Sequence, residues 1–429
     1  MGLGWREITA LATSRLGRQR LATALRGLSA PALRPVARLY RRTALRRVRI
    51  VAVTGSVGKT TTVRMLLAVL GLPLTELLRL LLNGMWAVPR RLLEIGPGAR
   101  WAVIEIGIDR AGLMARQADA VAPDIAVITA VAGEHLETLG SLDAIAREKV
   151  RLLAGLRPGG VAVLNGDDPR VRAMAPAARG QVWTFGFGPD NDVRAVEVVV
   201  DWPRGMRFLA LVRGERVPVA IPLLGRHMVP PALAALAVAA IEGIPLTRAA
   251  EALAATRPAA GRLQVVPLPG GVTFLMDDQK NSGASLIAAV ELAAEAPGRK
   301  ILVTAALRSG TAAAELQTAG ELIARVFSHV VAIGEDVEGL LGAIDAAGLP
   351  AERILRTAPG VLDAIACLRR LLRGGDVVLV KSRVFLKLDR LVLALQGREV
   401  ACDLSYCQLF SQRCAVCPAL GTARTGRFG

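Results

Sequence analysis

The chain has 429 residues, of which 52% are hydrophobic, with 54 Lys+Arg against 36 Asp+Glu. This length predicts two or three domains, and the mean hydropathy of +0.43 excludes a largely disordered protein, because apolar burial offsets the loss of chain entropy. No apolar run reaches the roughly 20 residues that a membrane helix needs, and the first residues lack the pattern of a secretory signal. The sequence therefore predicts a cytoplasmic protein.

The positive charge lies mostly at the start of the chain. Residues 1–49 hold twelve arginines and a single acidic residue, Glu7, which gives this segment +11 of the formal net charge of +18. A basic stretch rich in Leu and Ala predicts either a helix that binds the inner face of a membrane or a partner chain, or a helix that packs its leucines on the next domain. Nucleic-acid binding is not expected, because aromatic residues do not interleave with the arginines.

Strand-like apolar runs alternate with helical or loop stretches along the rest of the chain. The first block has them at 48–53, 101–106, 125–129 and 161–164, followed by a β-rich region over 193–221. The second block has them at 272–276, 301–304, 330–333 and 376–380. This alternation predicts an α/β fold with parallel sheets covered by helices. The predicted segments are a basic amphipathic leader (1–47), a central domain (48–258), a C-terminal domain (259–398) and a cysteine-containing tail (399–429).

Lysine is rare in this chain, since Arg outnumbers Lys 48 to 6. Arginine serves wherever only a positive charge is required, so the lysines are the first candidates for chemistry that needs a primary amine. They are Lys59, Lys149, Lys280, Lys300, Lys381 and Lys387.

The strongest local motif directly follows the first apolar run and opens a helical stretch. Glycines in such a loop let backbone N–H groups face phosphate oxygens, Lys59 reaches the β- and γ-phosphates, and Thr60 can bind Mg²⁺. The sequence therefore predicts nucleotide binding by Gly55, Ser56, Val57, Gly58, Lys59, Thr60 and Thr61.

This short loop, VTGSVGKTTT, resembles that of the Mur ligases, the ATP-dependent amide-forming enzymes of peptidoglycan synthesis. Further motifs follow in the order of that family, at 102–107, 123–129, 134–137, 146–149, 163–168, 225–227 and 261–263. The resemblance covers about residues 48–395 and is strongest to the D-alanyl-D-alanine-adding type. It implies a P-loop central domain with a mostly parallel sheet and a C-terminal Rossmann-like α/β domain.

The resemblance also implies roles for individual residues. Thr60 and Glu105 would bind Mg²⁺, and His135 would lie near a second Mg²⁺ or the substrate phosphate. Lys149 matches the lysine that is carbamylated in this family, and Lys381 belongs to a last-domain motif that resembles the acceptor side. The ATP contacts outside the loop would come from His227, Arg262, Asp278 and Asn281.

Several positions depart from the family pattern. Ala130, Met228 and Pro231 stand where the family has Asn, and the last-domain motif is reduced to Asp278-Gln279-Lys280-Asn281. These changes weaken adenine and acceptor recognition, whereas the phosphate and metal residues are retained. The roughly 48 residues before the first strand are also too few for the family's UDP-binding domain, so the family's usual donor site is expected to be missing.

Three functions follow from this pattern. The first is an ADP-forming ligase that joins a small or polymeric carboxylate to an amino-acid-like amine through an acyl phosphate, in cell-wall or surface-polymer synthesis. The second is a D-alanyl-D-alanine-adding muramoyl-peptide ligase with a rebuilt donor site. The third is a nucleotide-binding subunit that no longer ligates.

Four of the five cysteines lie in the tail. Clustered thiols in a cytoplasmic chain suggest zinc more than disulfides, although only the last pair has the usual C-x2-C spacing. A zinc site, an unpaired reduced tail and redox chemistry all stay open for Cys402, Cys407, Cys414 and Cys417.

Overall fold

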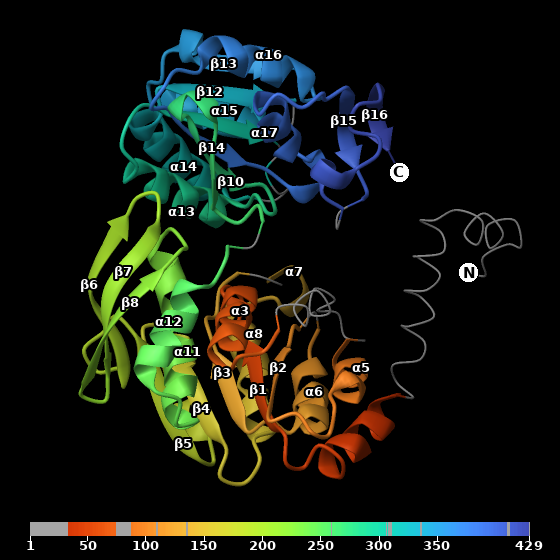
Figure 1. Ribbon diagram of the computed structural model, residues 1–429, viewed down its shortest axis with the longest axis vertical. Coiled ribbons are helices and arrows are strands. Elements are labelled where there is room, and N and C mark those ends of the chain that lie inside the picture. Colours follow the sequence, from red (N-terminus) through yellow and green to blue (C-terminus); the bar gives the residue numbers. More distant parts are fainter. Residues whose placement is uncertain are drawn as a thin grey trace, which may run out of the picture. The chain divides into compact units, whose positions relative to one another are not determined.

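The computed structural model describes residues 33–73, 87–108, 110–133, 136–258, 260–305, 307, 311–334, 337–409 and 412–428 (Figure 1). They fall into two compact units. The first unit comprises the described residues within Met1–Val198, Arg207–Ile221 and His227–Thr256, and the second comprises those within Val199–Met206, Pro222–Arg226 and Arg257–Gly429.

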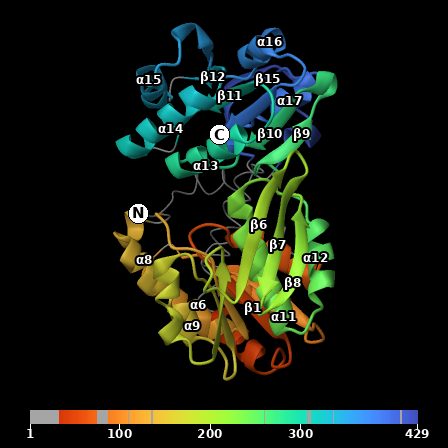
Figure 2. The same ribbon diagram turned by 90° about the vertical axis from the view of Figure 1, so that its left-hand side faces the viewer.

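An eight-stranded sheet forms the centre of the first unit, with the order β2-β1-β3-β4-β5-β6-β7-β8. Each neighbouring pair from β2 to β6 is parallel. The turns at 202–204 and 213–214 can join only antiparallel neighbours, so β6, β7 and β8 form a meander at one edge (Figure 2). The strands are β1 (Arg49–Thr54), β2 (Trp101–Glu105), β3 (Ile125–Ile128), β4 (Val161–Asn165), β5 (Gln181–Gly186), β6 (Val193–Asp201), β7 (Gly205–Val212) and β8 (Glu215–Ile221).

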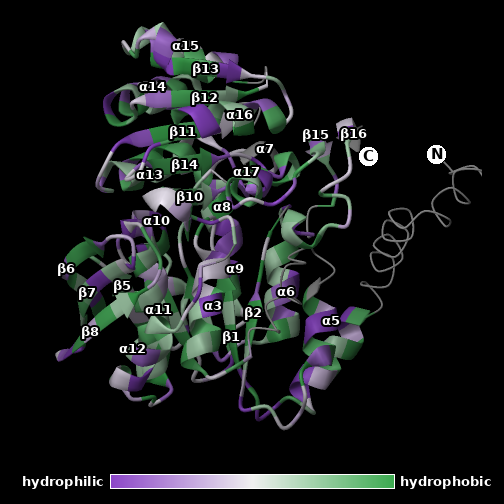
Figure 3. Cartoon of the chain, turned by 45° about the horizontal axis from the view of Figure 1, so that its top comes forward, coloured by the Kyte–Doolittle hydropathy of each residue, from purple (hydrophilic) through white to green (hydrophobic). Residues whose placement is uncertain are grey.

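Helices cover both faces of the parallel strands, which explains why these strands are apolar along nearly their whole length. All of β3 is buried, and β1 buries every residue after Arg49. The helix α11 packs on α3 and is apolar almost all round, in contrast with the more polar α5 (Figure 3). Helices before residue 257 are residues 33–42, α3 (Lys59–Val69), α5 (Ala87–Glu94), α6 (Leu113–Val121), α7 (Leu136–Leu139), α8 (Leu142–Lys149), α9 (Arg151–Ala154), α10 (Pro169–Arg172), η1 (Ala175–Ala177), η2 (Arg226–Met228), α11 (Val229–Ile241) and α12 (Leu246–Ala254).

The second unit contains a six-stranded sheet with the order β13-β12-β11-β14-β10-β9. It is parallel except for β9, which runs antiparallel to β10. Its strands are β9 (Gln264–Pro267), β10 (Thr273–Asp277), β11 (Lys300–Ala305), β12 (His329–Ile333), β13 (Ile354–Thr357) and β14 (Val377–Lys381). Its helices are η3 (Pro269–Gly271), α13 (Gly283–Ala294), α14 (Ala313–Val326), α15 (Glu338–Ala346), η4 (Ala351–Arg353), α16 (Leu362–Leu371), η5 (Val384–Leu386) and α17 (Asp389–Leu395).

The tail folds onto the second unit rather than extending from it. It contains two paired parallel strands, β15 (Cys402–Cys407) and β16 (Arg424–Phe428), and the turn η6 (Cys414–Val416). Arg390 on α17 is only 1% exposed, and it binds both the residues just before α17 and the strand β15. Its guanidinium donates to the carbonyl oxygens of Leu386, Lys387, Cys402 and Leu404 at 2.5–3.1 Å.

A second buried arginine, Arg41, joins the helical residues 33–42 to the first unit. It forms an ion pair with Asp124 at 2.8 Å, and Asp124 also accepts a hydrogen bond from the Ile50 backbone N–H at 2.9 Å. Its guanidinium donates further to the carbonyls of Leu45, Val48, Val121 and Ala122 at 2.6–3.2 Å. The described part of the predicted leader therefore packs into the first unit, and Ala37 and Leu45 are fully buried there.

The predicted α/β class, with a mainly parallel sheet in each of two units, is confirmed. Within the described ranges, no helix combines the length and the apolar character that crossing a bilayer requires.

Replacing Arg41 by Met should destabilise the first unit by at least about 2 kcal/mol, because four carbonyl oxygens and Asp124 would lose their buried guanidinium donor. Among the described residues, only Arg157 and Arg49 would still pair with Asp124, at 3.3 and 3.7 Å. Unfolding of the full chain in denaturant measures this. Arg42→Met is the matched control, since Arg42 is 54% exposed and pairs with the surface carboxylate of Asp119. It should cost at most about 1 kcal/mol. Equal losses in the two variants would contradict the role assigned to Arg41.

Candidate active site

The loop between β1 and α3 is shaped by two glycines. Gly58 precedes α3 with φ of 83°, a left-handed conformation that favours glycine. A Cβ on Gly55 would lie 1.9 Å from the Thr129 hydroxyl oxygen. That hydroxyl donates to the Val57 carbonyl at 2.6 Å. Thr129 can therefore bind the loop only because residue 55 has no side chain.

The segment after β3 is attached to this loop on one side. The backbone N–H of Ser56 donates to the Ala130 carbonyl at 2.8 Å, and its hydroxyl donates to the Ala132 carbonyl at 3.0 Å. Ala130 stands where the family resemblance leads us to expect Asn, yet its backbone still takes part in the loop. The segment leads to His135, which lies outside the described residues.

The same segment is attached on its other side to the NGDD motif after β4. The side-chain amide of Asn165 donates to the Thr129 carbonyl at 2.8 Å, and the Asp168 carboxylate accepts from the Val131 N–H at 2.7 Å. Asp168 also caps α10. From the sequence this motif is recognisable only as part of the family pattern, and nothing in it indicates the positioning role of Asn165 and Asp168.

Lys59 and Thr60 are the first residues of α3. The Lys59 ammonium donates to the carbonyls of Gly55 and Ser56 at 2.6 and 3.1 Å, so its side chain lies over the loop. The Thr60 hydroxyl donates to the Glu105 carboxylate at 3.0 Å. Glu105 ends β2, in register with Val53 of β1, and is 5% exposed.

A hydroxyl and a carboxylate that meet at a phosphate loop are suitable ligands for Mg²⁺. This ion prefers oxygen donors and takes only one or two protein groups, with phosphate and water completing its shell. Thr60 and Glu105 therefore fit the predicted metal site. His135, the third predicted ligand, has no described position.

Lys149 ends α8 and is 1% exposed. The preceding residue, Glu148, caps the neighbouring helix α6 by accepting hydrogen bonds from the N–H groups of Gly112 and Met114 at 3.0 and 2.8 Å. Glu148 thereby fixes the end of α8 against α6 and holds Lys149 in place.

The start of α11 lies beside the phosphate loop. The ring of Pro231 has its Cγ 3.9 Å from the point where a Cβ on Gly58 would be. His227 is exposed in η2, and Met228 beside it is buried. The described residues thus place apolar Pro231, rather than an amide side chain, against the loop.

A polar cluster lies at the carboxyl ends of β10, β11 and β14 in the second unit. Lys381 forms a buried ion pair with Asp277, its register neighbour on β10. Within the described part of the chain, the buried hydroxyls of Thr304 and Ser382 have no hydrogen-bond partners there. Carboxyl ends of parallel strands are where ligands bind in open α/β sheets.

The predicted residues of this unit come together at the cluster. Asp278 is 3% exposed, and its Oδ1 atom is buried without a hydrogen-bond partner among the described residues. Asn281 is also buried and donates to the Ala305 carbonyl at 2.9 Å. Arg262 is exposed, and its positive charge is near enough to lower the pKa of Lys381.

Burial raises the pKa of Asp278, and the negative charge of Asp389 raises it further, while Arg413 opposes the shift. Asp389 and Arg413 lie beyond the last motif, and no sequence signal identified them. Asp389 begins α17 and accepts a hydrogen bond from the Cys414 N–H at 3.0 Å, so α17 and the tail, which carries Arg413, each supply a charge near Asp278.

The tail cysteines do not come together as a set of metal ligands. All four are free thiols, and among the residues that the structure describes no three Cys, His, Asp or Glu side chains form such a group. Burial raises the pKa of Cys414, which disfavours the thiolate that zinc requires. The structure instead uses Cys402 and Cys414 as packing positions around Arg390 and Asp389.

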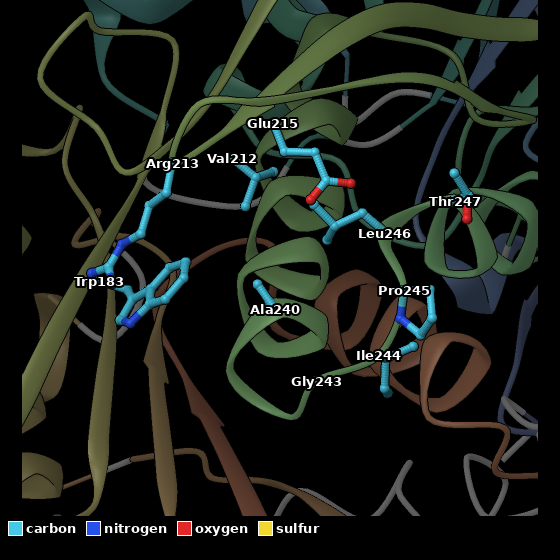
Figure 4. Close-up of a pocket in the computed structure, with 10 residues that line it drawn as sticks. All are labelled: Trp183, Val212, Arg213, Glu215, Ala240, Gly243, Ile244, Pro245, Leu246 and Thr247. Carbon is cyan, nitrogen blue, oxygen red and sulfur yellow. The ribbon is translucent and has the colours of Figure 1, made fainter.

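A hollow of about 430 Å³ lies elsewhere in the first unit (Figure 4). Trp183 and Arg213 border it, with the Arg213 guanidinium carbon 3.6 Å from the centre of the indole ring. Ile244 and Pro245, from the α11–α12 connection, also line it. The residues that line this hollow include none from the phosphate loop or the polar cluster, so it is not part of the candidate active site.

Gly55→Ala should displace Thr129 and distort the loop, because the new Cβ meets the hydroxyl at 1.9 Å. We expect ATP affinity, measured by calorimetry, to fall at least about tenfold. Gly96→Ala, at a position where a Cβ meets nothing within 4 Å, is the matched control and should bind as the wild type does. Unchanged affinity of Gly55→Ala would show that the loop tolerates this contact.

Asp278 should make stability fall as the pH rises. Its raised pKa lets the native chain keep a proton that the unfolded chain releases near pH 4, so the unfolded state binds fewer protons above that pH. Asp278→Asn should remove this dependence and gain stability relative to the wild type as the pH rises above about 4. Denaturant unfolding across this range measures it, with the exposed Asp345→Asn as control. Parallel pH profiles of wild type and Asp278→Asn would refute the assignment.

Two family models match the chain. The Mur ligase middle domain matches residues 53–239, and the Mur ligase, glutamate ligase domain matches residues 261–384.

Curated relatives are named UDP-N-acetylmuramoyl-tripeptide–D-alanyl-D-alanine ligase. The Escherichia coli protein is 31% identical over 67% of this chain, and the Bacillus subtilis protein is 33% identical over 59%. The matches span 65% and 55% of those two proteins. The Mycobacterium tuberculosis protein is 32% identical over 78% of this chain and 70% of its own length.

Solved structures of Mur ligases resemble this chain as well. MurF from Acinetobacter baumannii superposes with a TM-score of 0.73 at 26% identity, over 86% of this chain and 81% of that chain. Folylpolyglutamate synthase from Mycobacterium tuberculosis shares the fold, with a TM-score of 0.64 at 20% identity, over 92% of this chain and 99% of that chain. The chain therefore belongs to the Mur ligase family.

Proposed function

We propose that this chain is an ATP-dependent, ADP-forming ligase of cell-wall synthesis that joins a carboxylate to an amine. The observation that carries the proposal is the contact between Thr60 and Glu105 at the head of a phosphate loop already formed by Gly55, Gly58 and Lys59. Such a loop suits γ-phosphoryl transfer, which depends on positioning and on neutralising phosphate charge.

The names of the relatives suggest the substrates. They pair a UDP-N-acetylmuramoyl tripeptide with D-alanyl-D-alanine. We propose the same classes here, a muramoyl-peptide or related cell-wall carboxylate and an amino-acid-like amine. The amine site would use the cluster around Lys381 and Asp277.

The proposed reaction has two steps. A substrate carboxylate oxygen attacks the γ-phosphorus of ATP, which forms an acyl phosphate and releases ADP. The amine nitrogen then attacks the acyl carbon, phosphate leaves with the bonding electrons, and the nitrogen loses a proton.

The chain's residues would position these groups. Backbone N–H groups at the start of α3 and the Lys59 ammonium would bind the β- and γ-phosphates. Thr60 and Glu105 would hold Mg²⁺, which when bound supplies positive charge to the phosphates. His135 would lie near a second Mg²⁺ or the phosphate, and we propose that Lys149 carries a carbamate.

The remaining nucleotide contacts would come from His227, Arg262, Asp278 and Asn281. Pro231 against Gly58 favours a second candidate, a nucleotide-binding subunit that does not ligate, because Pro231 offers no amide to recognise adenine.

Lys59→Ala should lower kcat for ADP formation by at least about 100-fold, because the charge nearest the transferred phosphoryl group is lost. Coupled ADP detection with ATP, Mg²⁺, UDP-muramoyl tripeptide and D-alanyl-D-alanine measures this. Lys300→Ala is the matched control, because it removes a lysine whose ammonium donates to the Gly298 carbonyl at 3.0 Å, at the surface of the second unit.

Omitting each substrate in turn separates the candidates. Turnover that requires both carboxylate and amine supports the ligase. ATP binding without turnover, with any carboxylate–amine pair, would instead favour the non-ligating subunit.

A further inference from the structure

The helical residues 33–42 are held rigidly along one side. Arg41 and Ala37 are buried against the first unit, and the Tyr40 hydroxyl donates to the Ile95 carbonyl at 2.9 Å. These contacts fix the rotation of the helix about its axis and therefore decide which residues face outward. The helix is the red segment near the foot of Figure 1.

Two apolar side chains occupy the outward side. Val36 is 54% exposed and Leu39 is 64% exposed. They are three residues apart, which places them one above the other on a helix. Over the described part of the chain, the exposed large apolar residues are Val36, Leu39, Val57, Val199, Leu362 and Val416. Two of these six residues therefore lie on this one helix.

Exposed arginines lie on this helix and directly after it. Arg38 and Arg42 are exposed on the same helix, and Arg46 and Arg47 are exposed in the turn that follows it. The acidic partner of Arg38 and Arg42 is Asp119, at 3.0 and 3.3 Å. One carboxylate for two guanidiniums leaves the surface positively charged. We call Val36, Leu39 and these four arginines the basic helix face.

We propose that the basic helix face docks the protein on an anionic phospholipid surface. Apolar side chains on a basic helix enter the boundary between headgroups and acyl chains, while the arginines remain among the phosphates. Each arginine near such a surface adds about 1 kcal/mol of attraction. A nucleic acid would satisfy the arginines but not Val36 and Leu39, so the lipid surface is the better match. This inference does not depend on ligase activity.

Sedimentation of the full chain with vesicles tests the proposal. Vesicles of phosphatidylcholine alone are compared with vesicles that contain about 30% phosphatidylglycerol, at low and high salt. We expect the wild type to bind only the anionic vesicles, and less at high salt. Val36→Ser/Leu39→Ser and Arg46→Gln/Arg47→Gln should each lower the partition coefficient at least about tenfold.

Matched variants control for general changes in surface polarity and charge. Leu362→Ser/Val416→Ser removes exposed apolar residues elsewhere, and Arg216→Gln/Arg248→Gln removes exposed arginines elsewhere. Both should bind as the wild type does, and thermal unfolding checks that every variant folds.

Three outcomes would overturn the proposal. The first is a wild-type chain that sediments no more with anionic vesicles than with neutral ones. The second is Val36→Ser/Leu39→Ser binding as tightly as the wild type, which would assign binding to another segment. The third is loss of binding only in the arginine variant together with equal affinity for duplex DNA, which would mark a general polyanion site.

Discussion

The close approach between Thr129 and Gly55 is the constraint on which the candidate site depends. It brings β3 against the phosphate loop, and the hydrogen bond to Val57 turns that contact into a fixed geometry. From there Ser56, Asn165 and Asp168 hold the following segment from two sides. The loop and the segment beside it are thus preorganised by hydrogen bonds between side chains and backbone groups.

A buried arginine in each unit provides hydrogen-bond donors for buried carbonyl oxygens. Arg41 and Arg390 each donate to several carbonyl oxygens that helix and loop ends would otherwise bury unpaired. Arg41 also binds a carboxylate, whereas Arg390 donates to carbonyl oxygens and to the Cys402 sulfur. Each of them attaches a segment outside the matched family domains, which begin at residue 53 and end at residue 384. The two attached segments are therefore packed as parts of their units.

Much of the fold and part of the site could be predicted from the sequence, because both rest on local patterns. Apolar runs indicated the strands, and the glycine loop located Lys59 and Thr60. Asp168 could not be assigned its role, because its partner Val131 is distant in sequence. Asp389 and Arg413 carried no signal, since only folding brings α17 and the tail beside Asp278. The zinc alternative could not be judged from the sequence for a related reason: cysteine spacing does not say which way the thiols face.

The contacts of the helix α8 limit which insertions, deletions and substitutions this chain can accept. Its first turn is capped by Ser141, and its last turn presents Glu148 to α6 and buries Lys149. One added or deleted residue inside α8 would rotate everything after it by about 100°, taking the carboxylate off α6 and Lys149 out of the interior. Exposed positions of α8 can therefore change identity freely, while its length is fixed.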